Sequence, residues 1–231
     1  MAKKKITPLG ARIFGIGFAA FACIFMVIGG GTAWSQARKL TGWLPIEAQI
    51  IGGEVTSRRG KKGGTTYKPV VRFAYRVDGV ERNADTPLPI DMSIKDSSWA
   101  HDVVRRFPAG SRATAYYNPR APDEAFLLRE VSVSPYLFML FPMIHVCIGL
   151  GVWWFAGGQT LDARSKARRM GWMTMLWNGV GVLAFVHYLA IGGRLDWTAG
   201  LAFVIYAALG TGLVLTWVHF LRKAAGVIKN T

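Results

Sequence analysis

Hydrophobic residues in this chain gather into four long runs, and one long polar region separates the first run from the second. Each run is close to the ~20 apolar residues that a helix needs to cross a bilayer. The pattern therefore predicts four transmembrane helices, at residues 13–34, 136–157, 171–191 and 199–221. The polar region, residues 43–134, is predicted to fold as a small domain outside the membrane.

Within the polar region the pattern changes to the alternation that is typical of β-strands. It is clearest in residues 67–77, and Asp78-Gly79 follows directly. A type I′ hairpin turn needs positive φ at both central residues, which Asp-Gly supplies. This turn would place Arg76 opposite Glu81 as a cross-strand ion pair. The inward face of the strand would carry Pro69, Val71, Phe73, Tyr75 and Val77.

The other elements of the polar region are predicted from turn-forming and helix-capping residues and from shorter patterns of apolar and polar positions. They are a strand at 46–56 with a bulge or kink at Gly52-Gly53, a flexible basic loop at 57–66, a helix from Asp96 or Ser97 to about Phe107, and strands at 112–117 and 125–128 joined by a turn at Asn118-Pro119. The predicted fold class is an α-helical membrane protein with four transmembrane helices. A small extracytoplasmic antiparallel α+β domain, a curled sheet capped by one helix, is inserted between the first and the second.

The charge distribution predicts the orientation of these helices. Hydrophobic residues make up 52% of the chain although its net charge is +15, and Lys and Arg cluster in residues 1–12, 158–170 and 222–231. Because basic residues favour the cytoplasmic side, these three segments are predicted to be cytoplasmic and the polar domain extracytoplasmic. Membrane orientation explains the basic residues, so no nucleic-acid partner is expected. A cleaved signal peptide, with Ala33-Trp-Ser35 as its site, stays open as the alternative for the first run.

Three segments of the polar region carry a resemblance to a known family. They are Tyr67-Lys-Pro-Val-Val-Arg-Phe-Ala-Tyr-Arg-Val-Asp-Gly79, Phe107-Pro-Ala-Gly110 and Tyr116-Tyr-Asn-Pro119. With the flanking apolar runs, residues 13–155 resemble the bacterial membrane family called domain of unknown function 3592. The resemblance implies a bacterial membrane protein with an extracytoplasmic domain, and it brings no reaction with it. Its most specific residues, Tyr116, Tyr117, Asn118 and Pro119, are expected to be structural.

Candidate catalytic and metal-binding residues do not form a convincing site. Three histidines, His145, His187 and His219, fall in different runs at different depths, so they cannot converge on one metal ion or haem. An interhelical hydrogen bond is the expected role of His145, and interfacial positions are expected for the other two.

A possible serine, histidine and aspartate set also lacks the geometry of an enzyme. Its members, Ser97, Ser98, His101 and Asp102, crowd one helical segment with no oxyanion pattern beside them. A solvated helix face with an N-cap explains them better. The sequence therefore predicts a protein that is not an enzyme, with no cofactor and no metal.

A cluster of basic residues is the candidate contact surface of the polar domain. Anionic lipid headgroups or an acidic partner would attract such a cluster, whereas a solvated mobile loop is the alternative. The cluster consists of Arg58, Arg59, Lys61, Lys62 and Arg72.

The functional prediction follows from these points. The chain is expected to be a multi-pass protein of the bacterial inner membrane whose extracytoplasmic domain binds an envelope protein, a lipid or a toxin. The alternative is an accessory subunit of a membrane transport or envelope-assembly complex, and a homo-oligomer stays open.

A stripe of small residues in the first run, Ala11, Gly15, Ala19 and Cys23, would permit close helix packing.

Overall fold

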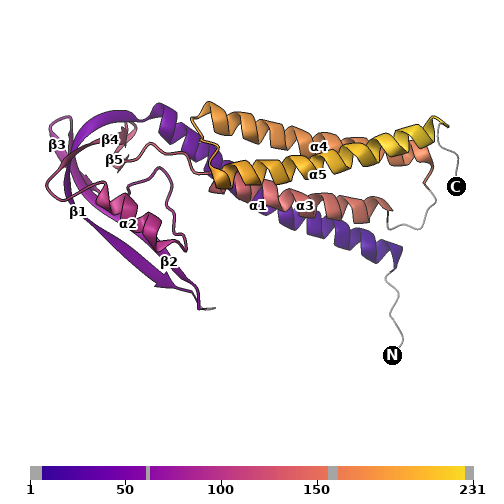
Figure 1. Cartoon of the computed structure of the whole chain (residues 1–231), viewed down its shortest axis with the longest axis horizontal. Helices are drawn as coiled ribbons and strands as arrows, with labels where there is room; N and C mark the ends of the chain where they lie inside the picture. Colours follow the sequence, from indigo (N-terminus) through magenta and orange to yellow (C-terminus); the bar gives the residue numbers. More distant parts are fainter. Residues whose placement is uncertain (1–6, 61–62, 156–160, 227–231) are drawn as a thin grey trace. The chain divides into compact units, whose positions relative to one another are not determined.

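The computed structural model describes residues 7–60, 63–155 and 161–226 of the chain, and Figure 1 labels its helices and strands. The chain divides into two compact units. The sheet unit comprises Trp34–Ser132, and the helical unit comprises Met1–Ala33 together with Val133–Thr231.

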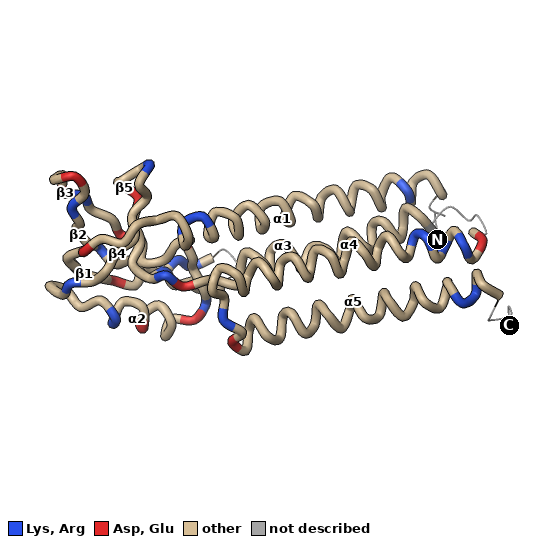
Figure 2. The backbone as a smooth tube through the Cα atoms, turned by 90° about the horizontal axis from the view of Figure 1, so that it is seen from above, with Lys and Arg blue, Asp and Glu red and all other residues tan. Residues whose placement is uncertain are grey.

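Four long helices account for the predicted apolar runs. All four are long and apolar enough to cross a membrane, judged by length and composition. Figure 2 shows that the Lys and Arg residues of these helices lie near helix ends and leave the central turns uncharged. The helices are α1 (Pro8–Gly42), α3 (Ser134–Phe155), α4 (Ala163–Ala190) and α5 (Trp197–Ala224).

Two of these helices extend well beyond the apolar runs that predicted them. The last residues of α1 belong to the sheet unit, so packing there continues the helix past the apolar run. At the start of α4, the Asp162 side chain accepts a hydrogen bond of 3.2 Å from the amide of Ser165. This N-cap begins the helix inside the basic segment that the sequence suggested was a loop. Hydropathy detects only the apolar part of a helix, which is why both predictions were too short.

Helix α1 packs against α3 through glycines. A Cβ added at Gly15 would lie 2.6 Å from the carbonyl oxygen of Gly149, and one added at Gly149 would lie 2.8 Å from the amide nitrogen of Ala19. Gly15 and Ala19 of the predicted stripe are therefore in the contact, whereas Cys23 is exposed. The reason is that residues four apart drift by about 40° per step around a helix with 3.6 residues per turn.

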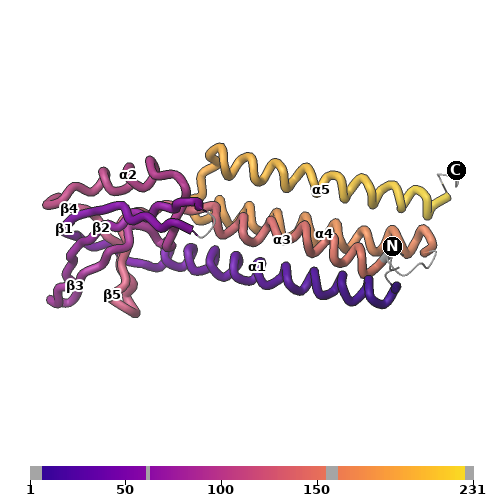
Figure 3. Tube along the Cα trace, turned by 90° about the horizontal axis from the view of Figure 1, so that it is seen from below, coloured from indigo at the N-terminus to yellow at the C-terminus, as the bar shows by residue number. Residues whose placement is uncertain are grey.

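Helices α4 and α5 run alongside each other in opposite directions (Figure 3). The rings of Trp177 and Tyr206 stack with centroids 4.3 Å apart. Each side chain also donates a hydrogen bond to the other residue's carbonyl oxygen, at 3.1 Å from Trp177 and 2.7 Å from Tyr206. These bonds join the two helices through polar groups that would otherwise be buried without partners.

The sheet unit has the predicted order of three strands, one helix and two strands. Its antiparallel sheet has the strand order β3-β2-β1-β4-β5 and lies in the chain between α1 and α3. Counted over all helices, the insertion is therefore not between the first and the second, because the short helix α2 belongs to the unit itself. The elements are β1 (Leu44–Arg59), β2 (Thr65–Val77), β3 (Val80–Ala84), α2 (Ser97–Arg105), β4 (Arg112–Asn118) and β5 (Ala121–Phe126).

The β2–β3 hairpin confirms the prediction made from Asp78-Gly79. These two residues have φ of 52° and 78°, as a type I′ turn requires. Arg76 lies opposite Glu81, and their side chains form an ion pair of 3.5 Å.

A bulge is present in β1, one residue before the predicted Gly52-Gly53. The pairing register with β2 shifts between Ile50 and Gly52. Gly53 follows, and a Cβ there would lie 2.8 Å from Cγ1 of Val104, which is in the last turn of α2. Glycine at this position therefore allows the helical segment to approach the sheet closely.

Two strand boundaries differ from the sequence-based prediction. Residues 57–59 and 65–66 of the basic segment are strand and not loop, because β1 continues to Arg59 in register with β2. The last strand begins at Ala121, earlier than the predicted 125–128, and contains Pro122. Proline fits there because β5 is an edge strand, where a missing N–H breaks no ladder.

The sheet curls so that its two edge strands approach each other, as the predicted curled sheet requires. Arg82 of β3 forms an ion pair with Asp123 of β5. Tyr75 of β2 donates a hydrogen bond of 2.8 Å to the carbonyl oxygen of Pro122. Helix α2 covers one side of the sheet (Figure 3) and buries Ala100 and Val103. The core inside the curl is Ala48, Ile50, Val71, Phe73, Tyr75, Val77, Phe107, Ala115, Ala125 and Leu127.

Candidate functional site

The predicted basic residues do not form one compact site. Arg58 and Arg59 lie opposite Thr66 and Thr65, and consecutive strand residues point to opposite faces of a sheet. Arg72 is six residues along β2 from Thr66, a separation of roughly 20 Å at the rise of a strand. The structure therefore spreads these cations over both faces of a long hairpin. The other two predicted residues, Lys61 and Lys62, lie outside the described residues.

The Tyr-Tyr-Asn-Pro segment ends β4 at Asn118 and enters the β4–β5 turn at Pro119. The Asn118 side chain accepts a hydrogen bond of 3.1 Å from the Arg120 amide and donates one of 3.1 Å to the Glu124 carboxylate. Local bonds of this kind are why asparagine is favoured before a turn. Pro119 occupies the turn itself. This agrees with the structural role predicted for Asn118 and Pro119.

The two tyrosines of the same segment pack into different parts of the unit. Tyr117 packs against the hydrophobic core. The Tyr116 ring stacks on Phe126 with centroids 5.5 Å apart, and the Arg129 guanidinium lies 5.4 Å from the Tyr116 ring centre. Trp43 contacts the same Phe126 ring at 5.3 Å. Aromatic stacking therefore joins the end of the segment to the residues that follow α1.

Polar contacts hold the chain's entry into the sheet unit against its exit. The Gln36 amide donates a hydrogen bond of 3.1 Å to the Ser132 carbonyl oxygen and accepts one of 2.9 Å from the Ser132 amide. Gln36 is 0% exposed. Arg129 donates a hydrogen bond to the carbonyl oxygen of Leu40. The sequence analysis missed Gln36 and Arg129, because no local pattern marks partners that are about ninety positions away.

An open cleft of about 830 Å³ lies beside these contacts. One wall is the last part of α1 with Trp43, and the other is the β4–β5 turn. The motif turn thus contributes Asn118 and Pro119 to the cleft. Its charged lining consists of Arg38, Lys39, Arg120 and Glu124.

The cations of this cleft differ from the six basic residues of the sheet unit that form ion pairs. Arg38, Lys39 and Arg120 form no ion pair with any described residue. The Lys39 ammonium instead lies 5.2 Å from the centre of the Trp43 ring, a cation–π contact. The cleft therefore holds uncompensated positive charge. Elsewhere in the unit, ion pairs with Asp or Glu are formed by Lys68, Arg76, Arg82, Arg105, Arg106 and Arg112.

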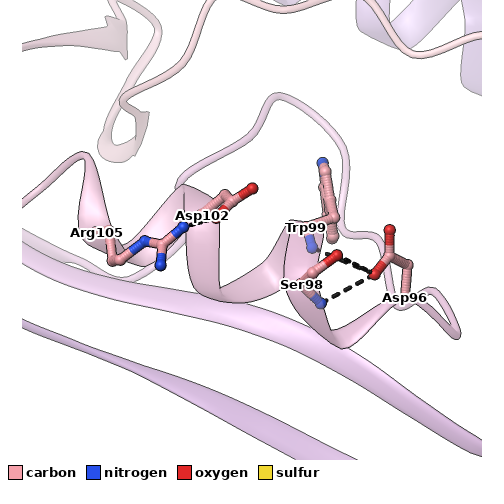
Figure 4. A network of polar contacts seen from close by, with 5 residues as sticks. All are labelled: Asp96, Ser98, Trp99, Asp102 and Arg105. Atoms are coloured by element: carbon pink, nitrogen blue, oxygen red, sulfur yellow. Dashed lines mark hydrogen bonds and ion pairs between the residues drawn. The ribbon is translucent and has the colours of Figure 1, made fainter.

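Ser98 and Asp102 of α2 are engaged in capping and surface pairing (Figure 4). The Ser98 hydroxyl donates a hydrogen bond of 2.5 Å to Asp96, and the Ser98 amide donates one of 2.9 Å to the same oxygen. The Ser98 hydroxyl bond, with smaller contributions from the Ser98 and Trp99 amides, lowers the pKa of Asp96 below its ordinary value. Asp102 pairs with Arg105. The Ser98 hydroxyl is thus directed at the N-cap and not at His101.

The three histidines of the helical unit have separate surroundings. His187 hydrogen-bonds through Nδ1 to the Tyr136 hydroxyl at 2.7 Å. The interhelical hydrogen bond predicted for His145 is therefore made by His187. His145 contacts the rings of Phe18 and Phe141, with centroids 5.4 and 5.6 Å away. Among the described residues, no three His, Cys, Asp or Glu side chains come together in a metal-binding group.

The fold and its turn thus define a small α+β domain inserted in a chain with four apolar helices. Residues 46–132 match the family model described as Domain of unknown function (DUF3592), the family that the resemblance predicted. The match is narrower than the predicted 13–155 and leaves the long helices outside it. No curated protein sequence matches the chain.

Proposed function

We propose that the chain is a multi-pass protein of the bacterial inner membrane whose sheet unit lies outside the cytoplasm and acts by binding and not by catalysis. One observation carries the membrane part of the proposal. Large apolar side chains on the long helices are exposed, including Val27 at 74%, Leu183 at 72% and Val204 at 66%. Exposing such a side chain to water costs about 1.5–3 kcal/mol relative to burying it, whereas lipid tails accept it. The match of residues 46–132 to the family supports a bacterial origin.

The placement of the sheet unit outside the cytoplasm is supported by charge. The first twelve residues carry Lys3, Lys4, Lys5 and Arg12 and no acid. The basic start of α4 and the basic end of α5 belong on the same side if each long helix crosses once. The positive-inside rule makes that side the cytoplasm. Residues 34–132 would then emerge on the other side.

Binding is favoured over catalysis by the polar groups of the sheet unit. Two members of the possible catalytic set have other roles, because Ser98 takes part in a helix cap and Asp102 in a surface ion pair. The unpaired cations of the cleft, in contrast, form a surface that would attract an anionic partner. A domain that holds such a surface at the membrane fits a lipid, an envelope protein or a toxin.

In-membrane photo-crosslinking with mass spectrometry tests this proposal. A photoreactive residue replacing Arg120 is expected to give specific adducts in the full-length protein. The same replacement at Val204, on an exposed face of α5, serves as the control and is expected to label bulk lipid. Specific protein adducts from the α5 position alone would favour an accessory subunit of a membrane complex. The absence of any specific adduct at Arg120 would contradict the binding role.

A further inference from the structure

We propose that the cleft between the end of α1 and the β4–β5 turn binds the phosphate headgroup of an anionic phospholipid. This deepens the proposed function and rests on it, because α1 must span the bilayer for the cleft to meet lipid. The site differs from the cluster of basic residues at 58–62 and 72 that the sequence predicted as the contact surface. Its ligand chemistry follows from charge, aromatic lining, position and size.

The charge of the cleft fits one phosphate diester. Arg38, Lys39 and Arg120 contribute three positive charges and form no ion pair with a described residue. The one acidic residue, Glu124, accepts a hydrogen bond from Asn118, which partly satisfies its carboxylate. Arginine is well suited to phosphate because its planar guanidinium donates two parallel hydrogen bonds. An anion in the cleft would therefore meet donors from both walls.

Aromatic side chains give the cleft the character of a membrane interface. Trp34 is 64% exposed and Trp43 is half-buried. Indole rings collect at the headgroup level of bilayers, where one edge is apolar and the other is hydrated. The apolar part of a lipid would lie against such rings while its phosphate meets the cations.

The position of Arg38 along α1 matches the depth of a headgroup. The apolar run of this helix ends at Ala33, and Trp34 follows directly. Arg38 comes four residues later in the same helix, about 6 Å further along its axis. A headgroup layer is roughly 5–8 Å thick on each side of the hydrocarbon core. The cations of α1 would therefore lie within that layer when the apolar run crosses the core.

The second wall depends on the motif turn. Asn118 accepts a hydrogen bond from the Arg120 amide, which fixes the backbone that carries the third cation. The cleft volume of about 830 Å³ is within the ~300–1,000 Å³ range of small-molecule sites, and it is large enough for a glycerol phosphate headgroup. The Tyr-Tyr-Asn-Pro segment thus acquires a role in positioning a ligand-binding cation.

Native mass spectrometry of the full-length protein in detergent tests the proposal. The probe is phosphatidylglycerol, and phosphatidylcholine is the zwitterionic comparison. The double variant R38Q/R120Q is expected to lower the apparent affinity for phosphatidylglycerol about 30-fold, since each basic residue near an anionic lipid contributes about fivefold. The control R58Q/R72Q removes the same charge from the β1–β2 hairpin and is expected to change the affinity less than about twofold. The charge-conserving R38K/R120K variant should retain most of the binding and excludes misfolding as the cause.

Three results would overturn the proposal. They are equal losses in both Gln variants, unchanged binding by R38Q/R120Q, and displacement of the lipid by soluble glycerol phosphate at the same concentration. The last would identify a soluble anion as the ligand. A cytoplasmic location of the sheet unit would contradict the proposed orientation but leave this binding intact, so the two failures are distinguishable.

Discussion

The hydroxyl of Tyr75 donates a hydrogen bond of 2.8 Å to the carbonyl oxygen of Pro122, 47 positions later in the chain. Tyr75 belongs to the alternating strand 67–77, and Pro122 follows the Tyr-Tyr-Asn-Pro turn. One of the segments that carry the family resemblance is thus in direct contact with the strand that follows another. The bond joins β2 to the edge strand β5 and holds the sheet in its curled form. Partial burial, together with the nearby Asp123 carboxylate, raises the pKa of Tyr75 and keeps its hydroxyl protonated as a donor.

Removing this hydroxyl should loosen the curl of the sheet. We expect Tyr75→Phe to destabilise the sheet unit by about 1 kcal/mol, because the Pro122 carbonyl loses its partner. Hydrogen exchange of β2 and β5 amides in the full-length protein measures this. Tyr116→Phe is the matched control, since the Tyr116 hydroxyl bonds to no side chain or backbone group within the described residues. Equal exchange in Tyr75→Phe and the unmodified protein would show that the bond does not stabilise the curl.

The glycine pair in β1 offers a second test of the packing. Gly53→Ala is expected to cost about 1–3 kcal/mol, because its Cβ would lie 2.8 Å from Cγ1 of Val104. Gly52→Ala is the control, since a Cβ there has no atom within 4 Å. Thermal unfolding in detergent, followed by near-ultraviolet circular dichroism, compares the two. Equal midpoints would mean that the α2 segment does not depend on Gly53 for its approach to the sheet.

The contacts between Gln36 and Ser132 should determine how firmly the sheet unit is closed at its entry and exit. Gln36→Ala removes both of the hydrogen bonds that Gln36 makes with the partly buried backbone of Ser132, at a cost of about 1–3 kcal/mol. Gln49→Ala removes an exposed side-chain bond to Gly110 and is expected to cost much less. Limited proteolysis after residue 132 reports the opening. Similar cleavage rates in the two variants would contradict this role of Gln36.

The N-cap of α2 predicts a dependence on acidic pH. The pKa of Asp96 is lowered in the folded protein, mainly by the Ser98 hydroxyl, so the cap stabilises the helix above the ordinary aspartate pKa of about 3.9. That stabilisation is lost as the pH falls through the lowered pKa. Hydrogen exchange of the first-turn amides of α2, after correction for intrinsic rates, should therefore rise below about pH 4. An Asp96→Ala variant should exchange quickly at every pH, and a parallel pH profile in that variant would refute the cap's role.

Features set by neighbouring residues could be predicted from the sequence. The turn at Asp78-Gly79 sets the register that places Arg76 opposite Glu81, and Asp96 as a capping residue indicated the start of α2. The apolar runs located the four long helices but not their polar ends. The cleft could not be predicted, because Arg38 and Arg120, which line it, are 82 positions apart in the chain. The curled sheet brings their two segments together. The run of adjacent cations at 58–62 predicted a contact surface instead, but the strand geometry places its described members on two faces of the sheet.

Reporter fusions in bacterial cells test the central claim most directly. A phosphatase that is active only outside the cytoplasm would be fused after Gly60, Ser165 or Thr231. The proposed orientation predicts activity for the Gly60 fusion and none for the other two. Activity after Ser165 with none after Gly60 would place the sheet unit in the cytoplasm and contradict the account.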